Sequence, residues 1–223
     1  MRSVSPAHHA STTRATRPAP LTHDTLIEAV DWLTARDAGL AHIVSTHGAP
    51  PLWARPRSFA TLARIILEQQ VSLKSAATLY ARVTTAMGGM TPAAVLTQGE
   101  PGLRAMGLTR QKARYVVALA ENVSNGTLHL PGLASLDDAE VAAALQRVPG
   151  IGPWTASIFQ LMALRRPDVW PPGDLALHMA LRQLHVLPQL PTSDQAQALA
   201  AVWSPWRAVA ARILWHGYLS ERR

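Results

Sequence analysis

The 223-residue sequence contains no cysteine. This absence excludes disulfides, iron–sulfur clusters, thiolate zinc sites and thiol nucleophiles, so any chemistry must use oxygen or nitrogen groups. No apolar run approaches the roughly 18 residues of a membrane span, so we expect no membrane partner. With 48% hydrophobic and 16% charged residues, the composition lies outside the range of disordered chains and predicts a soluble globular protein.

Lysine is nearly absent as well. Nineteen of the 21 basic residues are arginine, and only Lys74 and Lys112 are lysine. A mechanism that requires a lysine amine therefore has two side chains to choose from. The formal net charge of +7 indicates a polyanionic partner such as nucleic acid or an acidic membrane surface.

The first 23 residues hold three arginines, no acid and many small or proline residues. They contain no apolar stretch that could form the core of a secretory signal. We predict that residues 1–23 form a disordered basic tail and that residues 24–223 form the folded domain. The expected location is cytoplasmic, and nucleoid-associated if the protein is bacterial; an organelle transit peptide is the minor alternative.

The rest of the chain has helical periodicity interrupted by capping residues, with almost no alternating strand pattern. Ser72 and Thr109 each precede an amphipathic segment, Ser135 with Asp138 resembles a capping box, and Ser204 precedes the last helix. The pattern predicts an all-α protein of about ten helices in two lobes around a cleft. One lobe would hold the middle helices, and the first and last helices would pack beside it.

The segment from Leu145 to Thr155 places Pro149, Gly150, Ile151 and Gly152 between two helices. Glycines permit a tight turn and a close approach of a ligand to peptide N–H groups, and the start of the next helix adds a partial positive charge. Such a turn can hold a phosphate. Taken alone, the motif favours an ordinary interhelical turn, since helix ends often use glycine.

Asp174 follows Thr155 by nineteen residues, after a Pro-Pro-Gly approach that delivers its carboxylate to the first turn of another helix. The simplest interpretation of an isolated Asp here is a helix N-cap. Together, the glycine hairpin, one helix, a Gly/Pro loop and this Asp resemble the helix-hairpin-helix DNA glycosylase superfamily.

The chain resembles the alkylation-repair branch of that superfamily, typified by bacterial 3-methyladenine DNA glycosylase II. The resemblance extends over roughly residues 58–219. Three blocks carry it: residues 66–83, the hairpin with its following helix and the segment through 177, and residues 203–215. It implies an all-α fold with a helix-hairpin-helix motif and duplex DNA with a damaged base as the partner.

The resemblance implies a role for each matching residue of the base site. Asp174 is expected to be the catalytic carboxylate, which stabilises the positive charge that develops on the deoxyribose when the glycosidic bond breaks. Trp154 and Trp215 match aromatic positions of the base pocket, although both could equally be core residues. Gln69 would lie at the pocket edge. Gln70 would be the wedge that enters the duplex.

The resemblance also implies how the hairpin holds DNA. Its amides, together with Thr155, would grip a phosphate beside the lesion. The backbone carbonyls of Gln146, Val148 and Ile151 would face a Na⁺ or K⁺ ion. No other cofactor is expected.

Two departures from the family type qualify the resemblance. Gln70 stands where the bacterial type has an apolar residue, and no strand-rich segment supplies its N-terminal β subdomain. Superfamily members that also cut the strand use a lysine near the hairpin to form a Schiff base, but Trp154 occupies that place here. We therefore predict a monomeric, monofunctional enzyme that excises alkylated bases by base flipping, with Lys112 contacting phosphate or solvent.

Two alternatives remain open. The protein could be a glycosylase for oxidised or mismatched bases. It could also be a non-catalytic DNA-binding protein in which Asp174 only caps a helix.

Overall fold

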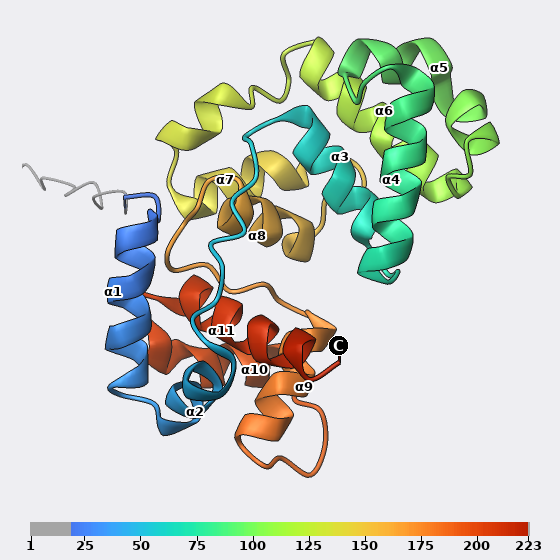
Figure 1. Cartoon of the computed structure of the whole chain (residues 1–223). Helices are drawn as coiled ribbons and strands as arrows, with labels where there is room; N and C mark the ends of the chain where they lie inside the picture. Colours follow the sequence, from blue (N-terminus) through green and yellow to red (C-terminus); the bar gives the residue numbers. More distant parts are fainter. Residues whose placement is uncertain (1–18, 223) are drawn as a thin grey trace, which may run out of the picture.

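The computed structural model describes residues 19–222. This part of the chain contains eleven α-helices, two short 3₁₀-helices and no strand (Figure 1). The predicted all-α class is confirmed, and the helix count is close to the expected ten. None of these helices combines the length and apolar character that crossing a membrane requires.

One lobe is built from the middle of the chain (Figure 1). Its helices are α3 (Phe59–Glu68), α4 (Leu73–Met87), α5 (Pro92–Ala105), α6 (Arg110–Ser124), η1 (Pro131–Ser135), α7 (Asp138–Gln146) and α8 (Pro153–Met162). Helix α3 packs against α4, α6 and α8, and α5 pairs with α6. Helix α3 is therefore the centre of this lobe.

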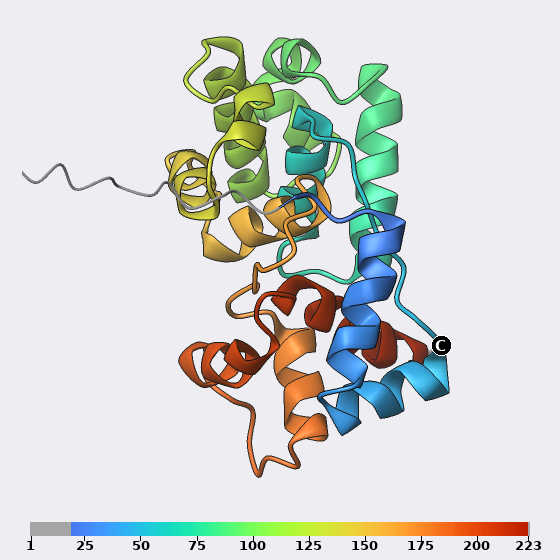
Figure 2. The same cartoon turned by 90° about the vertical axis from the view of Figure 1, so that its left-hand side faces the viewer.

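The second lobe combines the two ends of the described chain. Its helices are α1 (His23–Thr34), α2 (Ala38–His47), α9 (Leu175–Leu184), α10 (Ser193–Ala200), η2 (Ala201–Trp203) and α11 (Arg207–Ser220). Helix α11 packs against α1, α2 and α9. Figure 2 shows the same grouping from a second direction. The expected pairing of the first and last helices beside a middle lobe is confirmed.

Helix starts agree with the sequence where the cap is local. The Ser72 and Thr109 side chains accept the N–H of the third residue of α4 and α6, as predicted. The capping box of α7 was misplaced, because Asp137 and Glu140 form it, whereas Ser135 belongs to η1. A two-residue shift of this kind follows from having several polar residues at one boundary.

One helix start was not predicted, and another differs from the prediction. Helix α2 begins after Asp37, whose carboxylate accepts the N–H groups of Gly39 and Leu40. The same carboxylate accepts the Trp203 indole N–H at 2.8 Å, a distant partner that has no signal in the sequence near α2. The last helix starts at Arg207 and has no side-chain cap, so Ser204 is not its N-cap.

The start of the folded domain also differs from the prediction. Residues 1–18 of the expected tail lie outside the described residues. Leu21 is 1% exposed, and its N–H donates to the Arg165 carbonyl at 2.8 Å. Thr22 caps α1. The folded part therefore begins before residue 24, and the expected boundary was too late.

A buried arginine joins the two lobes. Arg212 of α11 is fully buried, and its guanidinium donates to the carbonyls of Leu52 at 2.9 Å, Leu161 at 2.7 Å and Ala208 at 2.9 Å. Burial lowers the pKa of Arg212 to about 9, so the side chain remains charged at neutral pH. Because Leu161 lies in α8 and Leu52 precedes α3, one side chain fixes α11 to the other lobe.

Replacing Arg212 by Met should destabilise the fold by about 2–5 kcal/mol, since two buried carbonyls outside α11 lose their donor. Urea unfolding followed by circular dichroism measures this loss. Arg104→Met removes an exposed arginine at the end of α5 and should change the free energy of unfolding by less than about 0.5 kcal/mol. Equal stability of the two variants would contradict the role assigned to Arg212.

Candidate active site

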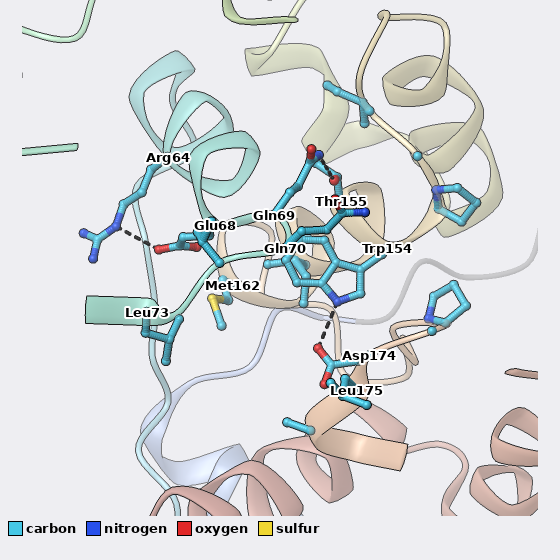
Figure 3. Close-up of a pocket in the computed structure, with 18 of the residues that line it drawn as sticks. Arg64, Glu68, Gln69, Gln70, Leu73, Trp154, Thr155, Met162, Asp174 and Leu175 are labelled. Atoms are coloured by element: carbon cyan, nitrogen blue, oxygen red, sulfur yellow. Dashed lines mark hydrogen bonds and ion pairs between the residues drawn. The ribbon is translucent and has the colours of Figure 1, made fainter. Parts of the chain in front are cut away.

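A large cleft opens between the lobes (Figure 3). The turn before α4, the hairpin before α8, the start of α9 and one side of α11 line it. Its volume is about 2060 Å³, whereas small-molecule pockets measure roughly 300–1,000 Å³. The cleft is therefore large enough for part of a macromolecule.

Asp174 is the carboxylate at the centre of this cleft. It is the N-cap of α9, where Oδ1 accepts the Leu177 N–H at 3.0 Å. The indole N–H of Trp215 donates to Oδ1 at 3.1 Å, and that of Trp154 donates to Oδ2 at 2.9 Å. The residue as a whole is 9% exposed. Three N–H donors converge on it, an arrangement that suits an anion.

The two tryptophans come from different lobes. Trp154 lies in the first turn of α8 and is partly buried, whereas Trp215 lies in α11 and is buried. Both line the cleft. Figure 3 shows the Trp154 indole pointing to Asp174. The structure thus brings together three of the residues that the resemblance places at the base site, and each indole donates a hydrogen bond to the acid.

The hairpin connects α7 to α8, and its two glycines differ in backbone conformation and in the space around them. Gly150 has φ +91°, and a Cβ there would overlap the Tyr115 ring, so only glycine fits. A Cβ at Gly152 would meet nothing within 4 Å. Gly152 is the N-cap of α8 and offers no side chain to its amides, and Pro153 follows it. The first turn of α8 is therefore open to an anion.

Gln69 holds the hairpin in place. Its Nε2 donates to the Gly150 carbonyl at 3.0 Å and to Thr155 Oγ1 at 2.8 Å. Thr155 is buried. The Thr155 hydroxyl therefore bonds to the residue that directly follows α3, and the phosphate contact expected of Thr155 stays a prediction. Gln69 itself lies on the cleft wall, where the sequence placed it.

The turn between α3 and α4 carries the predicted wedge. Gln70 is exposed and has φ +55°. Two apolar neighbours are exposed beside it, Val71 at 46% and Leu73 at 58%, and all three line the cleft. The sequence predicted only Gln70. The exposure of Val71 and Leu73 follows from the path of the backbone between α3 and α4, which the sequence did not predict. The wedge role of Gln70 stays a prediction.

The two lysines have different surroundings. Lys112 donates from Nζ to the Leu67 carbonyl at 2.7 Å, near the end of α3, and burial lowers its pKa. This carbonyl contact was not predicted, and because Lys112 is only partly buried, its expected contact with phosphate or solvent stays a prediction. Lys74, in the first turn of α4, is exposed and lines the cleft.

Sequence reasoning missed an acidic residue of the cleft wall. Glu68 forms two bonds with the Arg55 guanidinium, at 2.9 and 3.0 Å, and one with Arg64 at 3.0 Å (Figure 3 shows the Arg64 pair). The Arg64 pair has the i,i+4 spacing of a helical salt bridge, which is a local signal. The Arg55 and Glu68 pair is separated by thirteen residues, and no local pattern in the sequence indicates it.

The expected cation site depends on main-chain oxygens. Within residues 19–222, no group of three or more His, Asp or Glu side chains is placed to hold a metal ion. The carbonyls of Gln146, Val148 and Ile151 belong to the hairpin and its approach, and the Val148 carbonyl accepts the Ile151 N–H at 3.1 Å. A carbonyl has a second lone pair, so this bond is compatible with a cation ligand. The ion stays a prediction.

Curated relatives share part of their length with this chain. A putative DNA-3-methyladenine glycosylase of Bacillus subtilis is 27% identical over 184 residues, covering 79% of this chain and 64% of the relative. DNA-3-methyladenine glycosylase 2 of Escherichia coli is 31% identical over 166 residues, covering 69% and 55%. The chain thus spans less than two thirds of either relative.

Solved structures match the fold more completely. The Schizosaccharomyces pombe 3-methyladenine DNA glycosylase in complex with abasic DNA has a TM-score of 0.77 at 24% identity, covering 88% of this chain and 97% of that one. A DNA-3-methyladenine glycosidase from Bacillus halodurans has a TM-score of 0.70 at 28% identity, covering 88% and 91%.

A family model matches the chain directly. It is described as the HhH-GPD superfamily base excision DNA repair protein, and it matches residues 63–205. This range contains most of the middle lobe, the hairpin and Asp174. The chain therefore belongs to the HhH-GPD superfamily of base excision DNA repair proteins.

Proposed function

We propose that this protein is a monofunctional DNA glycosylase that excises alkylated bases such as 3-methyladenine from duplex DNA. One observation carries the proposal: the Asp174 carboxylate, beside a phosphate-binding type of hairpin, is held by indole N–H groups from both lobes. The names of the relatives support the alkylated substrate. The description of the family as a base excision DNA repair protein supports DNA as the partner.

The proposed reaction begins when the damaged nucleotide leaves the duplex, because a stacked base cannot reach a buried carboxylate. Breaking the N-glycosidic bond then develops positive charge on the deoxyribose. Asp174 stabilises that charge and orients the attacking water, and its three N–H donors fix the carboxylate before the reaction begins. A cationic alkylated base leaves without a strong general acid.

The hairpin supplies the grip on DNA in this proposal. The open first turn of α8 offers N–H groups and the positive end of the helix to a phosphate. Backbone carbonyls of Gln146, Val148 and Ile151 would hold a Na⁺ or K⁺ ion beside it, which adds positive charge. The protein would act as a monomer in the cytoplasm.

A second candidate is a glycosylase for another lesion. An 8-oxoguanine glycosylase/lyase from Clostridium acetobutylicum in complex with DNA shares the fold, with a TM-score of 0.73 at 17% identity. This likeness concerns the fold alone. Activity assays with different damaged bases are therefore needed to identify the lesion that the protein removes.

Asp174→Asn should lower release of methylpurine from methylated duplex by about 100-fold or more, because the anion at the sugar is lost. Asn can still cap α9, but its NH₂ group would face an indole N–H that now donates to a carboxylate oxygen, so the melting temperature should fall without loss of the fold. Asp24→Asn, an exposed acid in the first turn of α1, is the matched control and should keep full activity. Undiminished base release by Asp174→Asn would remove this carboxylate from the mechanism.

Gly152→Ala should weaken binding to abasic duplex about tenfold, because a methyl group would stand where the phosphate approaches the α8 amides. Its φ is −90° and its surroundings are open, so stability should not change. Gly150→Ala should instead lower the melting temperature, because its Cβ would overlap Tyr115. Fluorescence anisotropy and thermal melting separate the two effects; native affinity in Gly152→Ala would argue against the hairpin contact.

The native protein should leave the DNA strand intact until alkali is added. Treatment with borohydride should trap no protein–DNA adduct, because Lys112 is bound to the end of α3 and Trp154 follows the hairpin. A trapped adduct that disappears in Lys74→Ala would identify a Schiff base and overturn the monofunctional assignment.

A further inference from the structure

Two basic side chains of the cleft have no part in the reaction described above. The charged residues that line the cleft are Arg55, Arg64, Lys74, Arg147 and Arg222 with Glu68 and Asp174. The Asp174 carboxylate is held by N–H groups, and Arg55 is paired with Glu68 through two bonds. The wall formed by α3 and α4 therefore keeps Arg64 and Lys74 as cations with an unassigned role.

Arg64 is fixed in position, but its positive charge is not fully neutralised. Its Nε donates to Glu68 Oε1 at 3.0 Å, and its guanidinium lies over the Tyr80 ring at 5.4 Å from the centroid. In the part of the chain that the structure describes, no other hydrogen bond holds this guanidinium. Figure 3 shows its two terminal nitrogens pointing away from Glu68. Because Arg55 and Arg64 share one carboxylate, one positive charge remains on this group.

Lys74 adds a second cation to the same wall. It is exposed in the first turn of α4, directly after the exposed Leu73. None of the salt bridges among residues 19–222 involves Lys74. Guanidinium and ammonium groups are the usual partners of phosphate oxygens. Arg64 and Lys74 can therefore each neutralise one phosphate of a nucleic acid.

The exposed turn between α3 and α4 separates these cations from the hairpin. On one side of the turn, Gln69 bonds to the Gly150 carbonyl of the hairpin. Figure 3 shows Gln70 with Trp154, at the start of α8, on one side and Arg64 on the other. A groove of duplex DNA has one strand along each edge, so a side chain that enters the groove at Gln70 has the two strands on opposite sides. The hairpin and the α3–α4 wall would therefore meet different strands.

We propose that Arg64 and Lys74 bind phosphates of the undamaged, complementary strand, while the hairpin binds the damaged strand. This inference rests on the proposed function. Glu68 is then a positioning residue, because it orients the Arg64 guanidinium without touching DNA. Contacts to both strands give the protein a preference for duplex over single-stranded DNA that does not depend on the base opposite the lesion.

The test uses the variants Arg64→Gln and Lys74→Gln. Glu68 keeps its two bonds with Arg55 when Arg64 is replaced, and Lys74 is exposed, so both variants should melt close to the native temperature. Arg104→Gln is the matched control, because it removes the same charge from an exposed arginine of this lobe that does not line the cleft.

Fluorescence anisotropy measures binding to an abasic strand, alone and in a duplex, over a range of salt concentrations. Arg64→Gln and Lys74→Gln should each weaken duplex binding by about 3- to 10-fold. Each should also lower the slope of log K against log salt by about one. Binding to the single strand should stay native. An equal loss on the single strand, or the same loss in Arg104→Gln, would overturn the inference.

Neutral methylphosphonate linkages identify the strand that these residues contact. Placed in the complementary strand opposite the abasic site, they should weaken binding of the native protein but not of the double variant Arg64→Gln/Lys74→Gln. Placed in the abasic strand, they should weaken binding of both proteins through the hairpin. Sensitivity of the native protein to the abasic strand alone would assign both cations to the damaged strand and overturn the inference.

These measurements separate the inference from the proposed function. Abasic DNA requires no base excision, so the strand contacts are measured whether or not the native protein releases methylpurine. Failure of base release with strand-specific effects of Arg64→Gln and Lys74→Gln would remove the proposed function and keep the strand assignment. A native protein that does not prefer the duplex to the single strand would overturn the strand assignment, whatever its activity.

Discussion

The carboxylate of Asp174 depends on both lobes at once. Its first partner is the N–H of Leu177 within its own helix, but its other two are indoles from α8 and α11. A shift of either lobe would break one of these bonds. The helix-cap interpretation of Asp174 and the catalytic interpretation are therefore compatible, because the cap fixes one oxygen while the cleft fixes the rest of the group.

Helix α8 is held at each of its ends by a different kind of group. Its first turn follows the hairpin and offers open amides, and Gln69 ties that end to α3. Near its last turn the Leu161 carbonyl receives the buried Arg212 guanidinium. A cation at the carboxyl end complements the helix dipole, as an anion does at the amino end. Arg212 thus helps to hold the helix whose start faces the proposed phosphate.

The sequence revealed the features that depend on neighbours in the chain. Caps such as Ser72 and Thr109, the hairpin glycines and the approach to Asp174 all lie within a few residues of what they act on. Distant partners were not predictable: Gln69 bonds to residues more than eighty positions away. The carbonyl partner of Lys112 was missed for the same reason, since it lies in another helix.

The use of tryptophan here follows from its two distinct surfaces. The chain has seven tryptophans and two phenylalanines, and phenylalanine would supply a ring without an N–H donor. The indole N–H groups of Trp154 and Trp215 donate to the Asp174 carboxylate. The faces of both rings therefore remain for packing or for contact with a base. One residue type can therefore hold the carboxylate in place and build the apolar wall beside it. Replacing either tryptophan would therefore change the position of the Asp174 carboxylate and the shape of the pocket together.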